Sequence, residues 1–140
     1  MKVYVAGGWL EKDMIVAPMI KRLRDAGVTI THDWTDAGPS VDNVEAHVKH
    51  EDTLSPDVRK KHADQDLQGV YDCDFLWFIV PGYKGSAGSW TEFGFALAQP
   101  GRCMRTVVSG PWQKSIFCEL ADYKFATHEE ALQFLLKVKW

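Results

Sequence analysis

The sequence lacks the features that mark several large classes of protein. Its three cysteines, Cys73, Cys103 and Cys118, are widely spaced and form no CxxC pair, so we expect reduced, buried thiols and no disulfide framework. No apolar run approaches the length of a membrane-spanning helix, so no membrane partner is expected. The first residues enter a strand-like run at once and show no signal-peptide pattern. Together these absences predict a cytoplasmic protein.

An excess of basic residues is also missing. Sixteen lysines and arginines against nineteen acidic residues give a formal net charge of −3, whereas proteins that bind nucleic-acid polymers usually present a basic face. We therefore expect no nucleic-acid polymer as partner, although this charge does not exclude a free nucleoside or nucleotide. The sequence also has no GxGxxG dinucleotide fingerprint, no Walker lysine motif and no GxSxG nucleophile elbow.

Five histidines invite a metal hypothesis, which the rest of the sequence does not support. They are His32, His47, His50, His62 and His128. His47 and His50 could share one face of a helix, but neither an HExxH motif nor a cysteine pair accompanies them. We expect no metal ion and no cofactor.

Strand-like and helix-like segments alternate along the chain. Period-2 or fully apolar runs predict strands over 2–6, 28–34, 74–80 and 105–108, with a last short strand within 115–125. Helices are predicted over 16–27, 56–71 and 89–99 and after Thr127. A further short helix is predicted near 44–49, within a polar segment over 35–54 that we interpret as a long active-site loop. This alternation indicates one α/β domain over residues 1–140, a flavodoxin-like three-layer sandwich. We expect a mostly parallel five-stranded sheet in the order 2-1-3-4-5.

In such a sheet, ligands bind at the carboxyl ends of the strands. The turn after the first strand, the His32-Asp33 segment and the glycine-rich 81–89 loop all lie there. Glu92 follows that loop and has two interpretations: it completes a capping box with Ser89, or it is a functional carboxylate. Gly94, inside the same helix, costs about 1 kcal/mol relative to alanine, which suggests a close approach. Asp66 shares a helical stripe with Ala63 and Val70, so it is either a surface charge beside the core or part of a site.

Three segments, taken in order, resemble the nucleoside 2-deoxyribosyltransferase family, including its relatives that hydrolyse deoxynucleoside 5′-monophosphates. The first is the VYVAGGW run at 3–9, and the second is DQDL at 64–67 followed by DCD at 72–74. The third is the pattern Ser86-x-Gly88-x-x-x-Glu92-x-Gly94-x-Ala96. Together these segments span nearly the whole chain.

The resemblance implies a role for each matching residue. Glu92 matches the family's nucleophile, Asp66 its base-proximal acid and Tyr4 its substrate-facing tyrosine. The substrate-binding positions implied in the same way are Gly7, Gly8, Trp9, Ser86, Gly88 and Ser115. A carboxylate can capture the sugar carbon while an acid protonates the departing base. Water then completes hydrolysis of the N-glycosidic bond, and a second base completes transfer.

The form of the substrate stays open. Family transferases that act on free nucleosides usually carry an aspartate where Ser86 stands, whereas the monophosphate hydrolases carry serine, which can donate to a phosphate. Against a nucleotide substrate, the 8–12 segment (GWLEK) looks more like the transferases. A transferase on free nucleosides and a non-catalytic nucleotide-sensing or TIR-like module are the alternatives.

The resemblance also implies a homodimer or a higher homo-oligomer. In the family a neighbouring chain completes the site, in the region that matches Ser115 here. The surplus of aromatic residues, including Trp112, Phe117 and Trp140, suits an interface. The alternative is that these aromatic side chains belong to the core.

Overall fold

Five parallel strands form the centre of the computed structural model, which describes residues 1–83, 85–99, 101 and 104–139. Cys103 and Trp140, both named above, lie outside the described residues. The strands are β1 (Lys2–Ala6), β2 (Thr29–Ile30), β3 (Phe75–Ile79), β4 (Arg105–Ser109) and β5 (Tyr123–Phe125). Their order is β2-β1-β3-β4-β5 and every pair is parallel. The predicted fold class and strand order are therefore confirmed.

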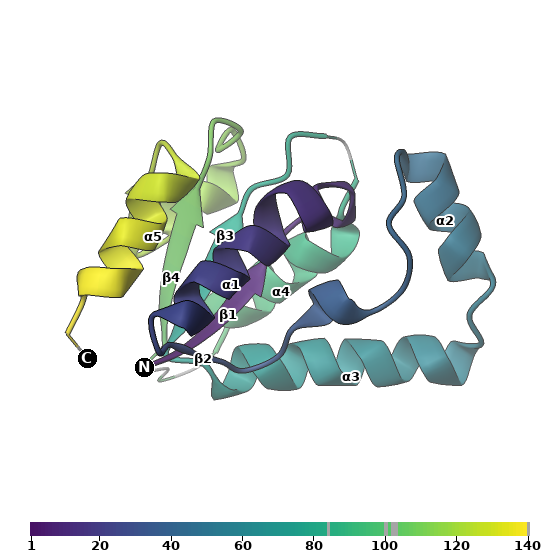
Figure 1. The fold of residues 1–140 in the computed structure, drawn as a ribbon, viewed down its shortest axis with the longest axis horizontal. Helices are drawn as coiled ribbons and strands as arrows, with labels where there is room; N and C mark the ends of the chain where they lie inside the picture. Colours follow the sequence, from purple (N-terminus) through teal and green to yellow (C-terminus); the bar gives the residue numbers. More distant parts are fainter. Residues whose placement is uncertain (84, 100, 102–103, 140) are drawn as a thin grey trace.

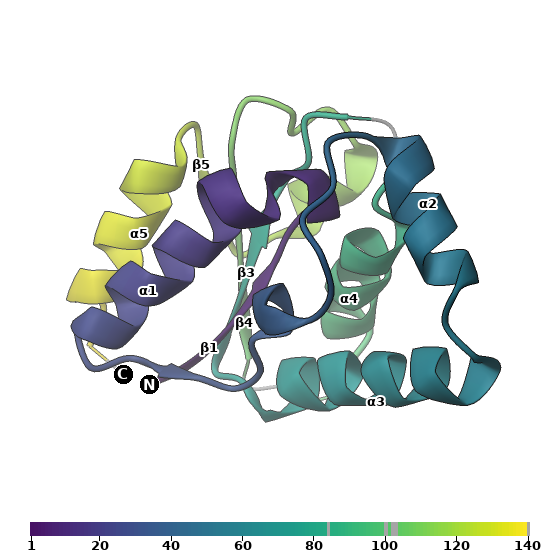
Figure 2. The ribbon, with the colours of Figure 1, turned by 45° about the vertical axis from the view of Figure 1, so that its right-hand side comes forward.

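The two faces of the sheet are covered by different helices. The helices are α1 (Ala17–Asp25), α2 (Val44–Asp52), α3 (Pro56–Asp72), α4 (Ala87–Leu97) and α5 (His128–Lys137). The short helical turns are η1 (Trp9–Glu11), η2 (Lys12–Val16), η3 (Trp34–Asp36) and η4 (Ile116–Leu120). Figures 1 and 2 show α1 and α5 on one face and α3 and α4 on the other, which gives three layers. Helix α2 lies beyond the end of the sheet and contacts η1.

Strand β3 occupies the middle of the sheet because it is apolar throughout. All five of its side chains are buried, and Trp77 pairs with Val5 of β1 and with Val107 of β4. A strand covered by helices on both faces needs no polar alternation. Cys73 and Cys118 are buried free thiols, as expected. Among the described residues, no helix combines the length and the apolar character that crossing a membrane requires.

Local signals in the sequence fix several helix ends. Ser55 accepts a hydrogen bond from the Val58 amide at 3.2 Å, with Pro56 as the first helical residue of α3. Thr127 and Glu130 form a reciprocal capping box at the start of α5. Gly27 follows α1 with a φ of 84°, a conformation that glycine adopts without strain.

The second strand is much shorter than the predicted range 28–34. The Thr31 amide still donates to the carbonyl of Val3 at 3.1 Å, and beyond it side chains make the hydrogen bonds that hold the segment. Thr31 donates its hydroxyl to the carbonyl of Gly69 at 2.7 Å, and the Trp34 indole donates to the carbonyl of Val5 at 2.8 Å. Asp33 accepts from the Thr35 amide at 3.1 Å and so starts η3. The chain therefore leaves the sheet and crosses its carboxyl edge.

Two expectations about helix packing were wrong. Ala63, expected on the inner stripe of α3, is exposed, while Gly69 and Val70 are buried. Gly94 of α4 is not closely approached, because a Cβ built there meets no described atom within 4 Å outside the helix's own backbone. The close approach occurs at Gly69 instead. A Cβ at that position would lie 2.7 Å from the Cβ of His32 and 2.9 Å from the Tyr4 ring.

Alanine substitutions at these two glycines should change stability in opposite directions. Gly69→Ala should lower the free energy of unfolding by roughly 1–3 kcal/mol, because backbone-anchored neighbours must move to admit the methyl group. Gly94→Ala should raise it by roughly 0.5–1 kcal/mol, because the helix gains a better former without a clash. Urea denaturation of both variants tests this. A stabilised Gly69→Ala protein would contradict the close packing of α3.

Candidate active site

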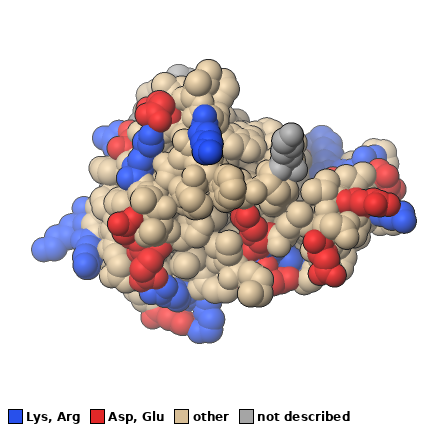
Figure 3. Space-filling model, turned by 90° about the horizontal axis from the view of Figure 1, so that it is seen from above, with Lys and Arg blue, Asp and Glu red and all other residues tan. Residues whose placement is uncertain are grey.

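A cavity of about 410 Å³ opens at the carboxyl end of the sheet. Its walls come from the turn after β1, from η1 and η3, and from α2, α3 and the start of α4. Glu92 and Asp66 both line it. Seen from the side on which the strands end (Figure 3), uncharged atoms cover much of this face, and acidic side chains lie both near its middle and at its rim. The cavity lining combines the aromatic side chains of Trp9 and Trp34 with histidine and carboxyl groups.

Glu92 points into the sheet edge and does not cap its helix. Helix α4 begins at Ala87 with Ser86 as its N-cap residue, three residues earlier than a capping box with Ser89 requires. The Glu92 side chain is 8% exposed, and it accepts a hydrogen bond from the Tyr4 hydroxyl at 2.9 Å. Tyr4 comes from β1 and is fully buried. The capping interpretation was therefore wrong. The hydrogen-bond partner of this carboxyl group is a side chain of the sheet.

Burial gives Glu92 an unusual affinity for its proton. The pKa of Glu92 is raised from 4.5 to about 8, first by the loss of solvation and then by the neighbouring charge of Asp66, while the hydrogen bond from Tyr4 opposes both. The pKa of the Tyr4 hydroxyl is also raised, first by burial and then by Glu92 and Asp66. The phenol therefore stays a hydrogen-bond donor. Two carboxyl groups that resist being ionised together share one cavity.

Asp66 enters the same cavity from α3. Its side chain is 27% exposed, and partial burial raises its pKa, while the nearby His32 and His62 and the Tyr4 hydroxyl oppose that rise. The Nε2 atom of His32 lies 3.3 Å from Oδ1 of Asp66. The interpretation of Asp66 as a plain surface charge was therefore wrong, because the side chain faces Tyr4 and Glu92 across the cavity.

The start of α4 forms another wall of the cavity. Gly85, Ser86 and Gly88 line it, and a Cβ built on Gly88 would meet no described atom within 4 Å. Ser86 has a φ of 59°, the one positive value among the described non-glycine residues. Its hydroxyl lies 2.6 Å from that of Ser89, which itself donates to the carbonyl of Ser86 at 3.0 Å. Ser89 lines the cavity as well, and the sequence argument, which treated it only as a cap, missed this.

The turn after β1 contributes unequally to the cavity. Gly7 and Trp9 line it. Gly8 is not among the described lining residues, and it packs against Tyr83 instead. A Cβ at position 8 would lie 2.6 Å from the Tyr83 hydroxyl. The implied role of Gly8 in substrate binding therefore stays a prediction. In the structure, the absence of a side chain at Gly8 leaves room for the Tyr83 ring.

Trp9 anchors helix α2 at the mouth of the cavity. Its ring stacks on His47 with the centroids 5.1 Å apart and lies 6.4 Å from His50, so the two histidines do share one helical face. The Lys12 ammonium lies 4.6 Å from the centroid of the Trp9 ring. The described residues bring no three His, Cys, Asp or Glu side chains together in a way that could hold a metal ion. Helix α2 lies within the 35–54 segment that the sequence indicated as an active-site loop, and it adds His47 and Glu51 to the cavity walls, which had not been singled out individually.

Ser115 is not among the described residues that line this cavity within its own chain. It caps η4 by accepting from the Phe117 amide at 3.3 Å. The surface around it is apolar, since Trp112 is 52% exposed and Phe117 is 54% exposed. These two aromatic side chains therefore do not belong to the core. Ile116 and Leu120 extend the same exposed patch.

Replacing the buried carboxyl group should stabilise the protein, and more so at higher pH. Between pH 4.5 and 8 the folded protein keeps the Glu92 proton that the unfolded chain has lost, so wild-type stability falls as pH rises through this window. Glu92→Gln removes that pH dependence. At the alkaline end of the window, the free energy of unfolding of the variant should exceed that of the wild type by at most roughly 4–5 kcal/mol. Urea titrations at pH 5, 7 and 8.5 measure it, with Glu45→Gln on the exposed face of α2 as the control. A stability difference that does not widen with pH would contradict the burial of Glu92.

Comparisons with known proteins point to one fold. No family model matches the sequence, and no curated protein matches it. Among solved structures, the chain is similar to a 2-deoxyribosyltransferase from the psychrotolerant bacterium Bacillus psychrosaccharolyticus, described as a biocatalyst for the synthesis of antiviral and antitumoral nucleosides. The match has a TM-score of 0.67 and 16% sequence identity, and it covers 100% of this chain and 93% of the other. The resemblance to this family is thereby confirmed at the level of the fold: the chain has the fold of a 2-deoxyribosyltransferase.

Proposed function

We propose that this protein is an enzyme that cleaves the N-glycosidic bond of a deoxynucleoside or of its 5′-monophosphate, with Glu92 as the nucleophile. The observation that carries the proposal is the buried Glu92 carboxyl group, held by Tyr4 and facing Asp66 across one cavity. The fold shared with a 2-deoxyribosyltransferase supports the same chemistry. A cavity of about 410 Å³ suits a small molecule of this kind.

The proposed reaction begins as the bond between C1′ and the base nitrogen breaks. The electron pair of that bond leaves with the base, and Asp66 gives its proton to the base. A Glu92 carboxylate oxygen bonds to C1′, which has gained positive character. Water or the nitrogen of a second base then attacks C1′, the bonding pair returns to Glu92, and the attacking group gives its proton to Asp66. The enzyme ends as it began.

The electrostatics of the pair suit this division of roles. Because both pKa values are raised, the two carboxyl groups together hold one proton near neutral pH. Tyr4 donates a hydrogen bond to Glu92 and so favours the ionised form of Glu92. Positive charge that develops on the sugar also favours ionised Glu92, and the shared proton then stays on Asp66.

The 85–89 turn is the proposed site for the 5′ end of the substrate. Ser86 and Ser89 supply hydroxyl groups there, and Gly88 leaves open space beside the first turn of α4. The free amides of a helix N-terminus favour an anion, and a serine accepts a phosphate where an aspartate would repel it. This favours the monophosphate as substrate, while the transferase-like 8–12 segment keeps free nucleosides as the alternative.

We also propose that the chain works as a homodimer or a higher homo-oligomer. The exposed apolar patch of Trp112, Ile116, Phe117 and Leu120 supports this, because aromatic side chains are enriched at such interfaces. Ser115 adjoins Ile116 in the sequence and is not among the described residues that line the cavity of its own chain, which suits a role at the cavity of a neighbouring copy. A nucleotide-sensing module without turnover is the alternative from another class of protein.

Purified protein incubated with deoxynucleosides, and separately with their 5′-monophosphates, tests the proposed function. The wild type should release free base, whereas Glu92→Gln should lose at least roughly a thousandfold in kcat while staying folded. Adding a different free base separates transfer, which forms a new nucleoside, from hydrolysis. Gly94→Ala, on the same helix but outside the cavity lining, is the matched control and should keep its activity. An active Glu92→Gln enzyme would remove Glu92 from the mechanism.

The shared proton predicts a bell-shaped pH dependence of kcat/KM. Activity should fall above about pH 8, where the pair loses its last proton and no acid remains. Tyr4→Phe removes the hydrogen bond that lowers the pKa of Glu92, so the alkaline limb should move to higher pH. Asp66→Asn removes the acid, so that limb should disappear along with most of the rate. Identical pH profiles for all three proteins would contradict the shared proton.

A further inference from the structure

Asp66 has a partner that the proposed mechanism does not use. His32 lies two residues past the end of β2, and its Nε2 atom is 3.3 Å from Oδ1 of Asp66. The two side chains are 30% and 27% exposed, so each is partly shielded from water. The charge of His32 is also the largest of the influences that oppose the rise in the pKa of Asp66.

The position of His32 is set by the backbone. Gly69 lies one turn beyond Asp66 on α3, and its missing side chain lets the Cβ of His32 approach to within 2.7 Å of where a Cβ would stand. The neighbouring Thr31 ties β2 to α3 through its 2.7 Å hydrogen bond to the carbonyl of Gly69. The imidazole is therefore held against the face of α3 that carries Asp66.

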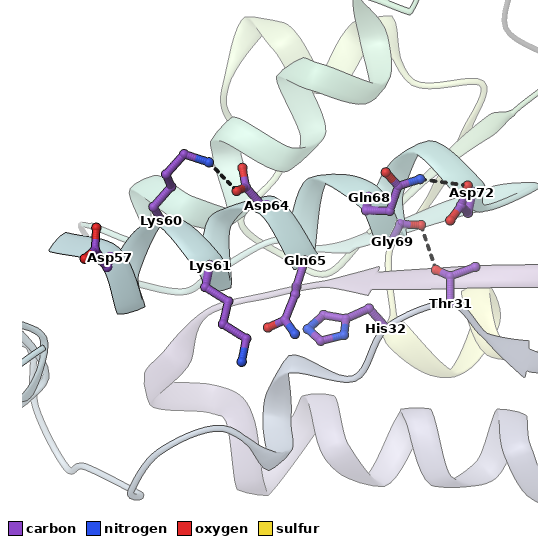
Figure 4. Close-up of a pocket in the computed structure, with 10 residues that line it drawn as sticks. All are labelled: Thr31, His32, Asp57, Lys60, Lys61, Asp64, Gln65, Gln68, Gly69 and Asp72. Carbon is purple, nitrogen blue, oxygen red and sulfur yellow. Dashed lines mark hydrogen bonds and ion pairs between the residues drawn. The ribbon is translucent and has the colours of Figure 1, made fainter. Parts of the chain in front are cut away.

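His32 forms part of the wall between two hollows. One is the cavity that contains Glu92 and Asp66. The other is an open hollow of about 740 Å³ along α3, which Figure 4 shows with the Gln65 side chain pointing toward the His32 ring. Both His32 and Gln65 line the two hollows. When a substrate fills the cavity, His32 still borders the outer hollow.

Other charged groups near His32 have different positions or partners. On α3, His62 lines the catalytic cavity and Lys61 lines the outer hollow. Asp33 is next in the chain, but it is bound to Arg24 at 2.6 Å. Glu92 lies on α4 and bonds Tyr4. Among the described residues, His32 is the one whose basic nitrogen lies within 4 Å of the Asp66 carboxyl group.

On the basis of the proposed function, we propose that His32 is the positioning residue for Asp66, holding Oδ1 so that the protonated Oδ2 faces the departing base. The imidazole donates its Nε2–H to Oδ1, a contact that tightens when substrate binds. As the glycosidic bond breaks, the Oδ2 proton passes to the base nitrogen, and the new carboxylate charge is stabilised by the same N–H. Water or the acceptor base later returns a proton to Asp66, and His32 is unchanged.

Leaving-group dependence tests this role in turnover. With bases that leave only when protonated, His32→Ala should lower kcat by roughly 10- to 100-fold and change KM by less than about twofold. Analogues whose electron-withdrawing substituents let the base leave as an anion should be cleaved at nearly the wild-type rate. His32→Gln keeps an N–H donor on a side chain of similar reach and should restore most of the loss. Equal losses for all bases in both variants would overturn the positioning role.

A measurement independent of activity tests the contact itself. The ¹⁵N chemical shift of His32 Nε2 should change in Asp66→Asn, because the hydrogen-bond acceptor loses its charge. It should stay unchanged in Asp64→Asn, a control on the same helix whose carboxylate pairs with Lys60. A shift that does not respond to Asp66→Asn overturns the inference whatever the activity. A protein that passes this test but cleaves neither deoxynucleosides nor their 5′-monophosphates overturns the proposed function instead.

Discussion

The burial of Glu92 above the Tyr4 hydroxyl is the constraint on which the rest of the site depends. A carboxyl group with 8% exposure needs a hydrogen-bond donor, and the neighbouring strand supplies one from a position that is itself fully buried. Tyr4 occupies that position because β1 lies next to the central strand and under α4. The catalytic cavity is therefore a consequence of strand order as much as of local sequence.

This arrangement is unfavourable by itself, so the surrounding scaffold must offset it. Burial and the charge of Asp66 both oppose ionisation of Glu92, which is the form that a nucleophile needs. The apolar core between the helical layers, centred on β3, supplies the stability that the cavity does not. A carboxyl group with a strongly raised pKa that lines a cavity is a candidate functional group, which is why Glu92 carries the proposed function.

The sequence predicted the architecture better than the walls of the cavity. Strand order followed from alternating patterns, and the caps at Ser55 and Thr127 followed from residue type. The resemblance to a known family singled out Glu92 and Asp66. The start of α4 was predicted at Ser89, whereas the helix begins at Ala87 after a left-handed Ser86 that makes no side-chain cap hydrogen bond, so the usual capping signal is missing there. The sequence placed His32 and the 35–54 segment at the carboxyl end of the sheet. The contact of His32 with Asp66 and the stacking of α2 on Trp9 join distant segments, which no local pattern records.

In the proposed mechanism, the choice between hydrolysis and transfer depends on which nucleophile reaches C1′, since both reactions use the two carboxyl groups in the same way. Water would compete with a second base for as long as the proposed glycosyl intermediate lasts. Helix α2 forms one wall of the cavity, and none of its residues, all of which are described, is buried. It contacts η1, where His47 and His50 stack on Trp9. The packing of this wall, more than the chemistry of the carboxyl groups, would therefore set how readily water reaches the proposed intermediate.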